Sequence, residues 1–298
     1  MMTATSIASS TAADTEARRQ RLVTALLLAP ATFWLVAFLV LPMVVVLVFS
    51  FGERAPAGGY QAGFTLANYL NLPARLTAFK NTLVLAPIGT ALCLLLAYPL
   101  AYYLAVKVKR AQLFLLILVI LPFWTSFLLR IYAWINILSN RGLPSWLEAI
   151  GIDGVRLINT PAAVLIGIVY GYLPLMVFPI FVSLERLDKR LLEASDDLGA
   201  SPLRTFLQVT LPLSLPGIVT GCMLVFILIM GEYLIPQLLG GGKVFFIGNA
   251  LVDLFLQSRN WALGSAVAVG LVVIMLVAVG VAMRVARRFG AARDESLL

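Results

Sequence analysis

A single carboxylate, Glu232, lies in an otherwise apolar run that begins at Gly217 and is long enough to cross a membrane. A charged group at membrane depth is costly unless it is paired or hydrated, so such a residue indicates function by default. Aromatic side chains lie beside it in the sequence or in other apolar runs: Tyr233, Trp124, Tyr132, Trp134, Tyr170 and Tyr172. A carboxylate with aromatic faces attracts ammonium groups through charge and cation–π contact. These residues are therefore candidates for the lining of a cation path.

Arg130 offers a competing explanation of Glu232. By helical rise it lies about 12 Å short of the outer end of its own apolar run, at a depth similar to that of Glu232. The two side chains could form an ion pair, or Arg130 could extend toward the membrane surface. An unpaired arginine would disfavour a cationic solute. The aromatic side chains most often serve only for packing in membrane helices. The sequence therefore leaves both explanations of Glu232 open, the cation path and the ion pair with Arg130.

No motif for catalysis or metal binding is present. The chain has no histidine, and its two cysteines, Cys93 and Cys222, lie inside apolar runs. Residues 240–243, Gly-Gly-Gly-Lys, are similar to part of a phosphate-binding loop, but such a loop needs Ser or Thr after the lysine and Val244 follows here. We therefore predict no catalytic residue, no metal site and no cofactor bound by this chain. A membrane enzyme is correspondingly disfavoured.

The stretch from Leu191 to Pro216 is the only long segment of the second half that is both charged and helix-like. Composition predicts a helix over Leu187–Leu198 that ends at Gly199, the residue type best suited to a left-handed cap. Ser201 is a natural N-cap and Pro202 a natural first helical residue. We therefore predict a second short helix, Pro202–Val209, stopped before the prolines at 212 and 216. The segment would form a helix–turn–helix across the membrane face.

Two properties of this segment indicate a docked partner. Asp196 and Asp197 follow Glu193 at helical spacing, so one face is acidic and unsuited to anionic lipid. Small residues at the corner would let another surface approach closely: Ala194, Gly199, Ala200 and Ser201. An ordinary cytoplasmic loop with two interfacial helices is the plain alternative.

Composition places these segments in an all-α integral membrane protein. The chain has 298 residues, of which 61% are hydrophobic and 12% charged, whereas soluble domains carry about 25% charged residues. Six apolar runs reach the ~20 residues that a bilayer requires. They are Leu22–Phe51, Phe79–Val106, Gln112–Leu138, Thr160–Leu184, Gly217–Pro236 and Trp261–Met283. The first is too long for a signal peptide. No clear internal repeat is visible, which disfavours a secondary transporter.

The distribution of Lys and Arg predicts the orientation. Most of the 22 basic residues fall in the two tails and in the segments around 107–110 and 185–216, which the positive-inside rule assigns to the cytoplasm. The net charge of +8 is explained in this way and does not indicate nucleic acid. We predict a cytoplasmic tail over 1–21, a membrane domain over 22–285 with the charged segment at 186–212, and a cytoplasmic tail over 286–298.

The charged segment resembles a known signature. Glu193-Ala194, then Gly199, Phe206 and Leu211-Pro212, are similar to the EAA motif of ATP-binding cassette importer permeases, with Ser195 where that family often has Ala. The resemblance implies that the segment is a coupling helix seated in a cleft of a cytoplasmic ATPase subunit. The implied coupling residues are Glu193, Ala194, Asp197, Gly199, Ala200 and Ser201.

Over about residues 20–285, the chain is most similar to the spermidine/putrescine class of these permeases. This rests on Leu121–Leu138, Gly167–Ile180, 184–217, Gly231–Gly242 and Asn260–Ala268. The resemblance implies polyamine import by alternating access; importers of iron, phosphonates or amino-acid-like solutes share much of this frame. A channel would lack the coupling helix.

The resemblance also implies partners and a location. ATP and Mg²⁺ would be bound by a pair of cytoplasmic ATPase subunits rather than by this chain. A second, homologous permease chain would complete the pathway. An extracytoplasmic solute-binding protein would meet the outer loops at 52–76, 139–159 and 237–260. The chain would be a multi-pass protein of a bacterial inner membrane with both termini in the cytoplasm.

Overall fold

The computed structural model describes residues 19–20 and 22–294, and its long elements are all helices. Five of them are long and apolar enough to cross a membrane: Leu22–Ser50, Leu76–Lys107, Pro161–Glu185, Pro202–Met230 and Trp261–Arg284. A bent pair of helices can supply a sixth span. The predicted all-α, polytopic fold is confirmed. Almost all of the predicted tail 1–21, and residues 295–298 of the other tail, lie outside the described residues.

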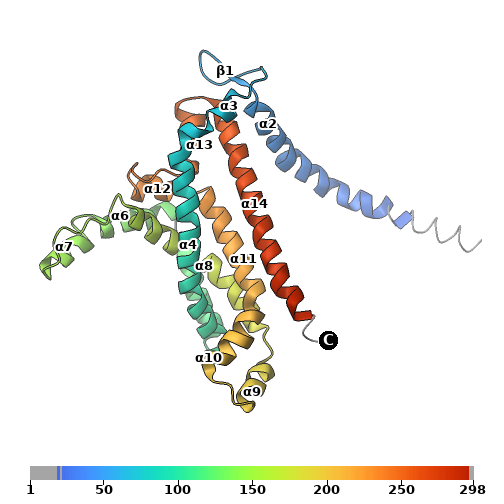
Figure 1. Ribbon diagram of the computed structural model, residues 1–298, viewed down its shortest axis with the longest axis vertical. Helices are drawn as coiled ribbons and strands as arrows, with labels where there is room; N and C mark the ends of the chain where they lie inside the picture. Colours follow the sequence, from blue (N-terminus) through green and yellow to red (C-terminus); the bar gives the residue numbers. More distant parts are fainter. Residues whose placement is uncertain (1–18, 21, 295–298) are drawn as a thin grey trace, which may run out of the picture.

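Three helices form the centre of the bundle: α4 (Leu76–Tyr102), α8 (Pro161–Glu185) and α11 (Leu211–Met230) (Figure 1). The π-helical turn η3 (Tyr103–Lys107) extends α4. Side chains between the three helices are fully buried, among them those of Met176 and Ile229. Gly217 allows α11 to approach α8, because a Cβ there would lie 2.5 Å from the carbonyl oxygen of Pro179. The helix α14 (Trp261–Asp294) packs on the outside of α11.

The first span diverges from this bundle. Its last part, the π-helical turn η1 (Val36–Val40) followed by α2 (Leu41–Ser50), packs on α14, and the rest extends away (Figure 1). None of its most apolar window is buried. The connection to α4 holds a two-stranded hairpin and two short helices. These are β1 (Glu53–Arg54), antiparallel to β2 (Tyr60–Gln61) with Glu53 opposite Gln61, then α3 (Ala67–Leu70) and η2 (Leu72–Arg75).

The third predicted span, Gln112–Leu138, is not one helix. The segments Gln112–Trp124 and Phe127–Ala149 meet at 88°. Thr125 and Ser126 have extended ψ values of 153° and 128°, which breaks the helical hydrogen-bond ladder. The elements are α5 (Gln112–Ile120), η4 (Leu121–Trp124), α6 (Phe127–Leu138) and α7 (Leu143–Ala149), and the arm of α6 and α7 projects from the bundle (Figure 1). We refer to residues 121–130 as the elbow.

The fifth span also differs from prediction. The short helix expected to stop before Pro212 instead continues through α10 (Pro202–Thr205) and η5 (Phe206–Thr210) into α11, and the helix ends at Met230 rather than Pro236. Membrane helices tolerate proline when neighbouring groups satisfy the freed backbone atoms. Here the π-helical turn η5 precedes Pro212, and the Thr220 hydroxyl donates to the carbonyl oxygen of Pro216 at 2.7 Å.

Residues 237–260, predicted as a loop, are largely helical and partly buried. The chain passes from α12 (Leu234–Leu239) into α13 (Ile247–Val252) and η6 (Asp253–Gln257). The backbone N–H of Ile247 donates to the Thr82 hydroxyl of α4 at 2.9 Å, which anchors the segment in the bundle. Apolar periodicity does not reveal such short helices, because their burial depends on contacts with α4 and α8.

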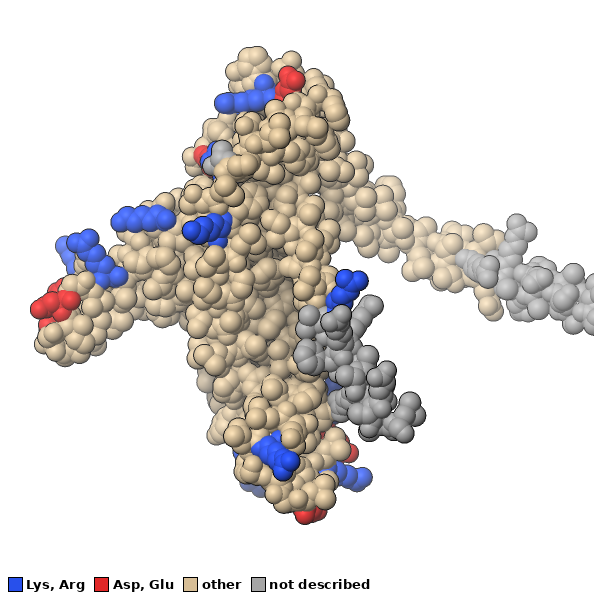
Figure 2. All heavy atoms as spheres, in the orientation of Figure 1, with Lys and Arg blue, Asp and Glu red and all other residues tan. Residues whose placement is uncertain are grey.

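Charged side chains gather at the two ends of the bundle and on the α6–α7 arm, whereas the middle of the visible face is largely uncharged (Figure 2). This is the pattern expected of a chain whose middle lies in hydrocarbon.

Candidate functional site

The charged segment forms the predicted corner at one end of the bundle (Figure 1). Its first helix is α9 (Lys189–Asp197). Asp188 caps this helix, because its carboxylate accepts from the N–H of Arg190 at 3.0 Å. Gly199 adopts the left-handed conformation at φ +76°, and Ser201 caps the next helix by accepting from the N–H of Arg204 at 3.4 Å. The local helix–corner–helix geometry thus matches the prediction, although the second helix is the start of a long span.

The side chains expected to couple this chain to an ATPase lie at the surface. Ala200 is half-buried and the others are exposed: Glu193, Ala194, Asp197, Gly199 and Ser201. Two leucines at the corner are exposed as well, Leu198 at 88% and Leu203 at 68%. A Cβ built on Gly199 would meet nothing within 4 Å. The corner is therefore an open apolar tip with acidic neighbours, which another protein surface can reach.

Two contacts connect this tip to the membrane helices. The hydroxyls of Ser195 and Thr205 share a hydrogen bond of 2.8 Å, which links α9 to α10. Phe206 of η5 places its ring edge-on to those of Tyr98 and Tyr102 in α4, at 5.7 and 6.1 Å between centroids. Sequence reasoning missed the two tyrosines, because nothing in the α4 sequence shows which element faces it.

Glu232 lies just past the end of α11 and is only 7% exposed. One oxygen of its carboxylate accepts the N–H groups of Tyr233, Leu234 and Ile235 at 2.9, 2.8 and 3.3 Å. The other accepts the hydroxyl of Tyr172 on α8. The carboxylate therefore caps α12 and ties it to α8, so its charge is offset by four donors. Whether it also meets a transported cation stays a prediction.

Arg130 and Glu232 do not pair. Among the described residues the one ion pair joins Arg75 to Asp253, at 3.5 Å. Arg130 is 9% exposed, and its guanidinium carbon lies over the rings of Phe127, Phe123 and Tyr170, at 5.3, 5.5 and 6.0 Å from their centroids. The physical reason is that Glu232 is already held by Tyr172 and α12, whereas the elbow turns Arg130 into an aromatic cluster.

The predicted path residues thus fall into separate places. Tyr172 and the backbone of Tyr233 adjoin Glu232, whose carboxylate both of them contact. Trp134 packs edge-on against Tyr170, 5.4 Å between centroids, beside Arg130. Trp124 and Tyr132 are exposed at 79% and 52%. The structure does not bring the rings and the carboxylate together into one cation cage.

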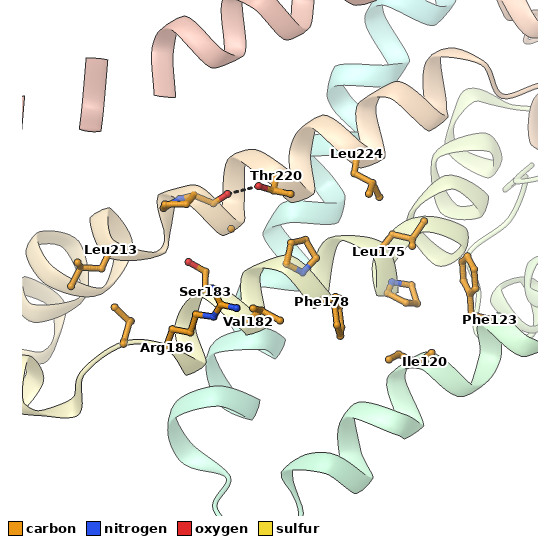
Figure 3. A pocket seen from close by; sticks show the side chains of 15 residues that line it. Ile120, Phe123, Leu175, Phe178, Val182, Ser183, Arg186, Leu213, Thr220 and Leu224 are labelled. Carbon is orange, nitrogen blue, oxygen red and sulfur yellow. Dashed lines mark hydrogen bonds between the residues drawn. The ribbon is translucent and has the colours of Figure 1, made fainter. Parts of the chain in front are cut away.

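A cavity of about 830 Å³ opens between α8 and α11 (Figure 3). Phe123 and Ile120 lie near one end and Arg186 lies near the other (Figure 3). Apolar side chains from facing helices line most of it, with Ser183 and Thr220 among its few polar groups and no carboxylate among its lining residues. Sequence reasoning did not find this cavity, because it arises from two helices that are distant along the chain.

A family model and similar curated proteins assign this chain to the same family. Residues 4–291 match the family described as "Binding-protein-dependent transport system inner membrane component". The chain is 43% identical over 247 residues to the spermidine/putrescine transport system permease protein PotB of Haemophilus influenzae, covering 81% of this chain and 86% of that one. It is 42% identical over 248 residues to PotB of Escherichia coli, covering 81% and 90%.

Solved structures share the fold. A chain of a bacterial alginate ABC transporter, crystallised in complex with an alginate pentasaccharide-bound periplasmic protein, is similar with a TM-score of 0.71 at 20% identity, covering 92% of this chain and 96% of that one. A chain of the inward-facing MetNI methionine ABC transporter is similar with a TM-score of 0.53 at 20% identity, covering 73% and 98%.

Proposed function

Because this chain belongs to the family of inner membrane components of binding-protein-dependent transport systems, we propose that it is the permease subunit that carries polyamines, such as putrescine and spermidine, across the membrane. The permease function follows from the family and from relatives named as transport permeases. The polyamine substrate is supported by the names of the two relatives that are 42–43% identical over four-fifths of this chain.

Energy enters the chain at the corner formed by α9 and α10. The observation that carries this proposal is the exposed apolar tip at Leu198 and Leu203, beside the open backbone at Gly199. An exposed apolar patch with a polar rim marks a protein-binding surface. ATP and Mg²⁺ are bound by a pair of separate ATPase subunits, whose movement reaches α4 and α11 through the Ser195–Thr205 and Phe206–Tyr98 contacts.

The tip lies in the cytoplasm, and the opposite end of the bundle meets the solute-binding protein. This orientation rests on the positive-inside distribution of Lys and Arg. The β1–β2 hairpin at the opposite end and α7, which projects from the side of the bundle, are the exposed features available for such contact (Figure 1). A second, homologous permease chain closes the cavity between α8 and α11, which this chain leaves open and without a carboxylate.

The coupling proposal is tested by Gly199→Asp, assayed by co-purification of the ATPase and by uptake-coupled ATP hydrolysis in vesicles. A side chain at φ +76° is strained, and a carboxylate at the tip would repel an acidic or apolar cleft. We expect both readouts to fall.

The matched control is Gly151→Asp. Gly151 also has a positive φ, +88°, and also has open space around it, but it lies in the segment that follows α7. The control should retain ATPase association. Wild-type association and hydrolysis in the Gly199→Asp variant would contradict the proposed docking site.

A further inference from the structure

The guanidinium of Arg130 is buried without a counter-charge. It is 9% exposed, and its Nε atom has no hydrogen-bond partner. No carboxylate of the described residues lies within ion-pair distance of it. The side chain does not extend to the membrane surface, because it lies across the rings of Phe123, Phe127 and Tyr170.

The depth of this group favours an anionic partner. Tyr170, one of its ring contacts, is nine residues into α8, about 14 Å from the helix start by helical rise. That position lies within a hydrocarbon layer about 30 Å thick. Cation–π contacts offset part of the cost of burying the charge, but they do not satisfy the Nε–H group, which has no hydrogen-bond partner among the described residues.

The described residues of this chain do not supply the missing anion. Glu232 is the carboxylate at comparable depth, and both of its oxygens are occupied by Tyr172 and the N–H groups of α12. The remaining acidic side chains of the described residues lie in the connecting segments or, as with Glu148 and Glu185, at the ends of helices. A second copy of this chain would bring the same occupied carboxylate, so it could not serve either.

The surface around Arg130 is open to another protein. Trp124 and Leu129 of the elbow are exposed at 79% and 69%. Phe123 both contacts the guanidinium and lines the cavity between α8 and α11 (Figure 3). The elbow therefore joins a buried orphan cation to the open side of the cavity.

We propose that the elbow docks against the second permease chain, and that an Asp or Glu within a span of that chain forms an ion pair with Arg130. This rests on the proposed function, since it requires the two-permease importer. The pair would give the interface its register, and it would neutralise a positive charge beside the cavity through which a cationic solute has to pass. It also accounts for an arginine that is otherwise unfavourable to such a solute.

The test uses the whole complex, with this chain tagged and co-expressed with the second permease chain and the ATPase. Arg130→Glu should lower recovery of the second permease chain by about tenfold or more, because it places two carboxylates together in low dielectric. In the Arg130→Glu background, each intramembrane Asp or Glu of the second chain is then replaced by Arg, one at a time. Recovery of the second chain and uptake should be restored at one position only.

Two variants control for misfolding and general charge effects. Arg141→Glu changes an exposed arginine that precedes α7 and should leave recovery unchanged. Arg130→Met keeps an unbranched apolar stem that can pack on the same rings, and removes the guanidinium and its charge. It should also weaken the complex, and a neutral Leu at the partner position identified by the scan should restore it.

Wild-type recovery of the second chain with Arg130→Glu would overturn the proposal, as would failure of every reciprocal substitution. A third result would also overturn it: the Arg130→Met variant recovers the second chain normally but loses a tightly bound anionic lipid in native mass spectrometry. That result would identify a lipid phosphate as the counter-ion of Arg130. If the unmodified chain retains neither the second permease nor the ATPase, the proposed function itself fails, which is a separate result.

Discussion

At the scale of residues, Glu232 shows how one side chain can organise the end of a membrane helix. Its carboxylate receives three backbone N–H groups of α12 and the hydroxyl of Tyr172. Hydrogen bonds to a charged acceptor contribute more than those between neutral groups. The residue predicted to meet a cation therefore has a structural role, whether or not it also contacts the solute.

Glu232→Gln separates these two roles. We expect it to lower the free energy of unfolding by about 1–3 kcal/mol, since a neutral amide accepts from the α12 N–H groups less strongly. Thermal unfolding of the purified complex measures that loss. If Glu232 also meets the solute, polyamine uptake will fall while the complex still assembles.

Tyr172→Phe is the comparison, because it removes one hydrogen bond but keeps the charge. Uptake should then stay closer to that of the unmodified protein at a similar loss of stability. Wild-type uptake by Glu232→Gln would remove this residue from the cation path and leave the structural role alone.

At the scale of elements, the junction between α9 and α11 is the part best placed to transmit movement. The π-helical turn η5 carries Phe206, whose ring meets two tyrosines of α4, and Tyr98 continues the contact by a 2.9 Å hydrogen bond to Ser214 of α11. π-Helical turns within α-helices occur frequently at functional sites.

Phe206→Leu should weaken transmission without preventing docking, because it removes the edge-to-face contacts, worth about 0.5–1.5 kcal/mol each, and leaves the tip intact. We expect ATPase co-purification to persist and uptake per ATP hydrolysed to fall. Leu207→Ala, an exposed neighbour in the same turn, is the control. A normal ratio of uptake to hydrolysis in Phe206→Leu would contradict this role.

The contact between α8 and α11 depends on the absence of a side chain at Gly217. A Cβ at this position would meet the Pro179 carbonyl oxygen and the Ser183 Cβ at 2.5 Å, so Gly217→Val must separate the two helices. We expect a loss of about 1–3 kcal/mol, measured as a lower midpoint of thermal unfolding. Gly280→Val on α14, where a Cβ has open space, should change the midpoint little.

At the scale of the whole molecule, the chain has one acidic and apolar tip beyond the spans and, at the opposite end, a partly helical face (Figure 1). Five of the described helices are long and apolar enough to be spans, and the bent pair can supply a sixth. Because α8 is the span between them, the tip and the segment that follows α7 should lie on opposite sides of the membrane.

Single cysteines test that topology. With Cys93 and Cys222 replaced by Ala, Asp196→Cys in α9 should react with a membrane-impermeant maleimide only after the cells are permeabilised. Asp153→Cys, in the exposed segment after α7, should react without permeabilisation once the outer membrane is passed. Equal labelling of both positions from one side would contradict the proposed orientation, because a single span, α8, lies between them.

The sequence by itself determined the features that arise from local chemistry. Hydropathy determined the membrane class and the approximate positions of the spans, and Gly199, Ser201 and Pro202 determined the corner, because left-handed caps and N-caps depend on neighbouring residues. The EAA-like residues identified the family. These features needed no knowledge of which helices touch.

Only the tertiary structure decided which side chains meet across the fold. The 88° bend at the elbow, the end of the fifth span at Met230 and the cavity between α8 and α11 were not predictable, since each depends on packing between distant segments. The same holds for Glu232 and Arg130. Both are intramembrane charges of opposite sign, yet Glu232 is held by Tyr172 and α12 while Arg130 lies among rings. The physical reason is that a carboxylate takes the donors, and a guanidinium the ring faces, that the fold places nearest, and residue type and depth alone do not specify those neighbours.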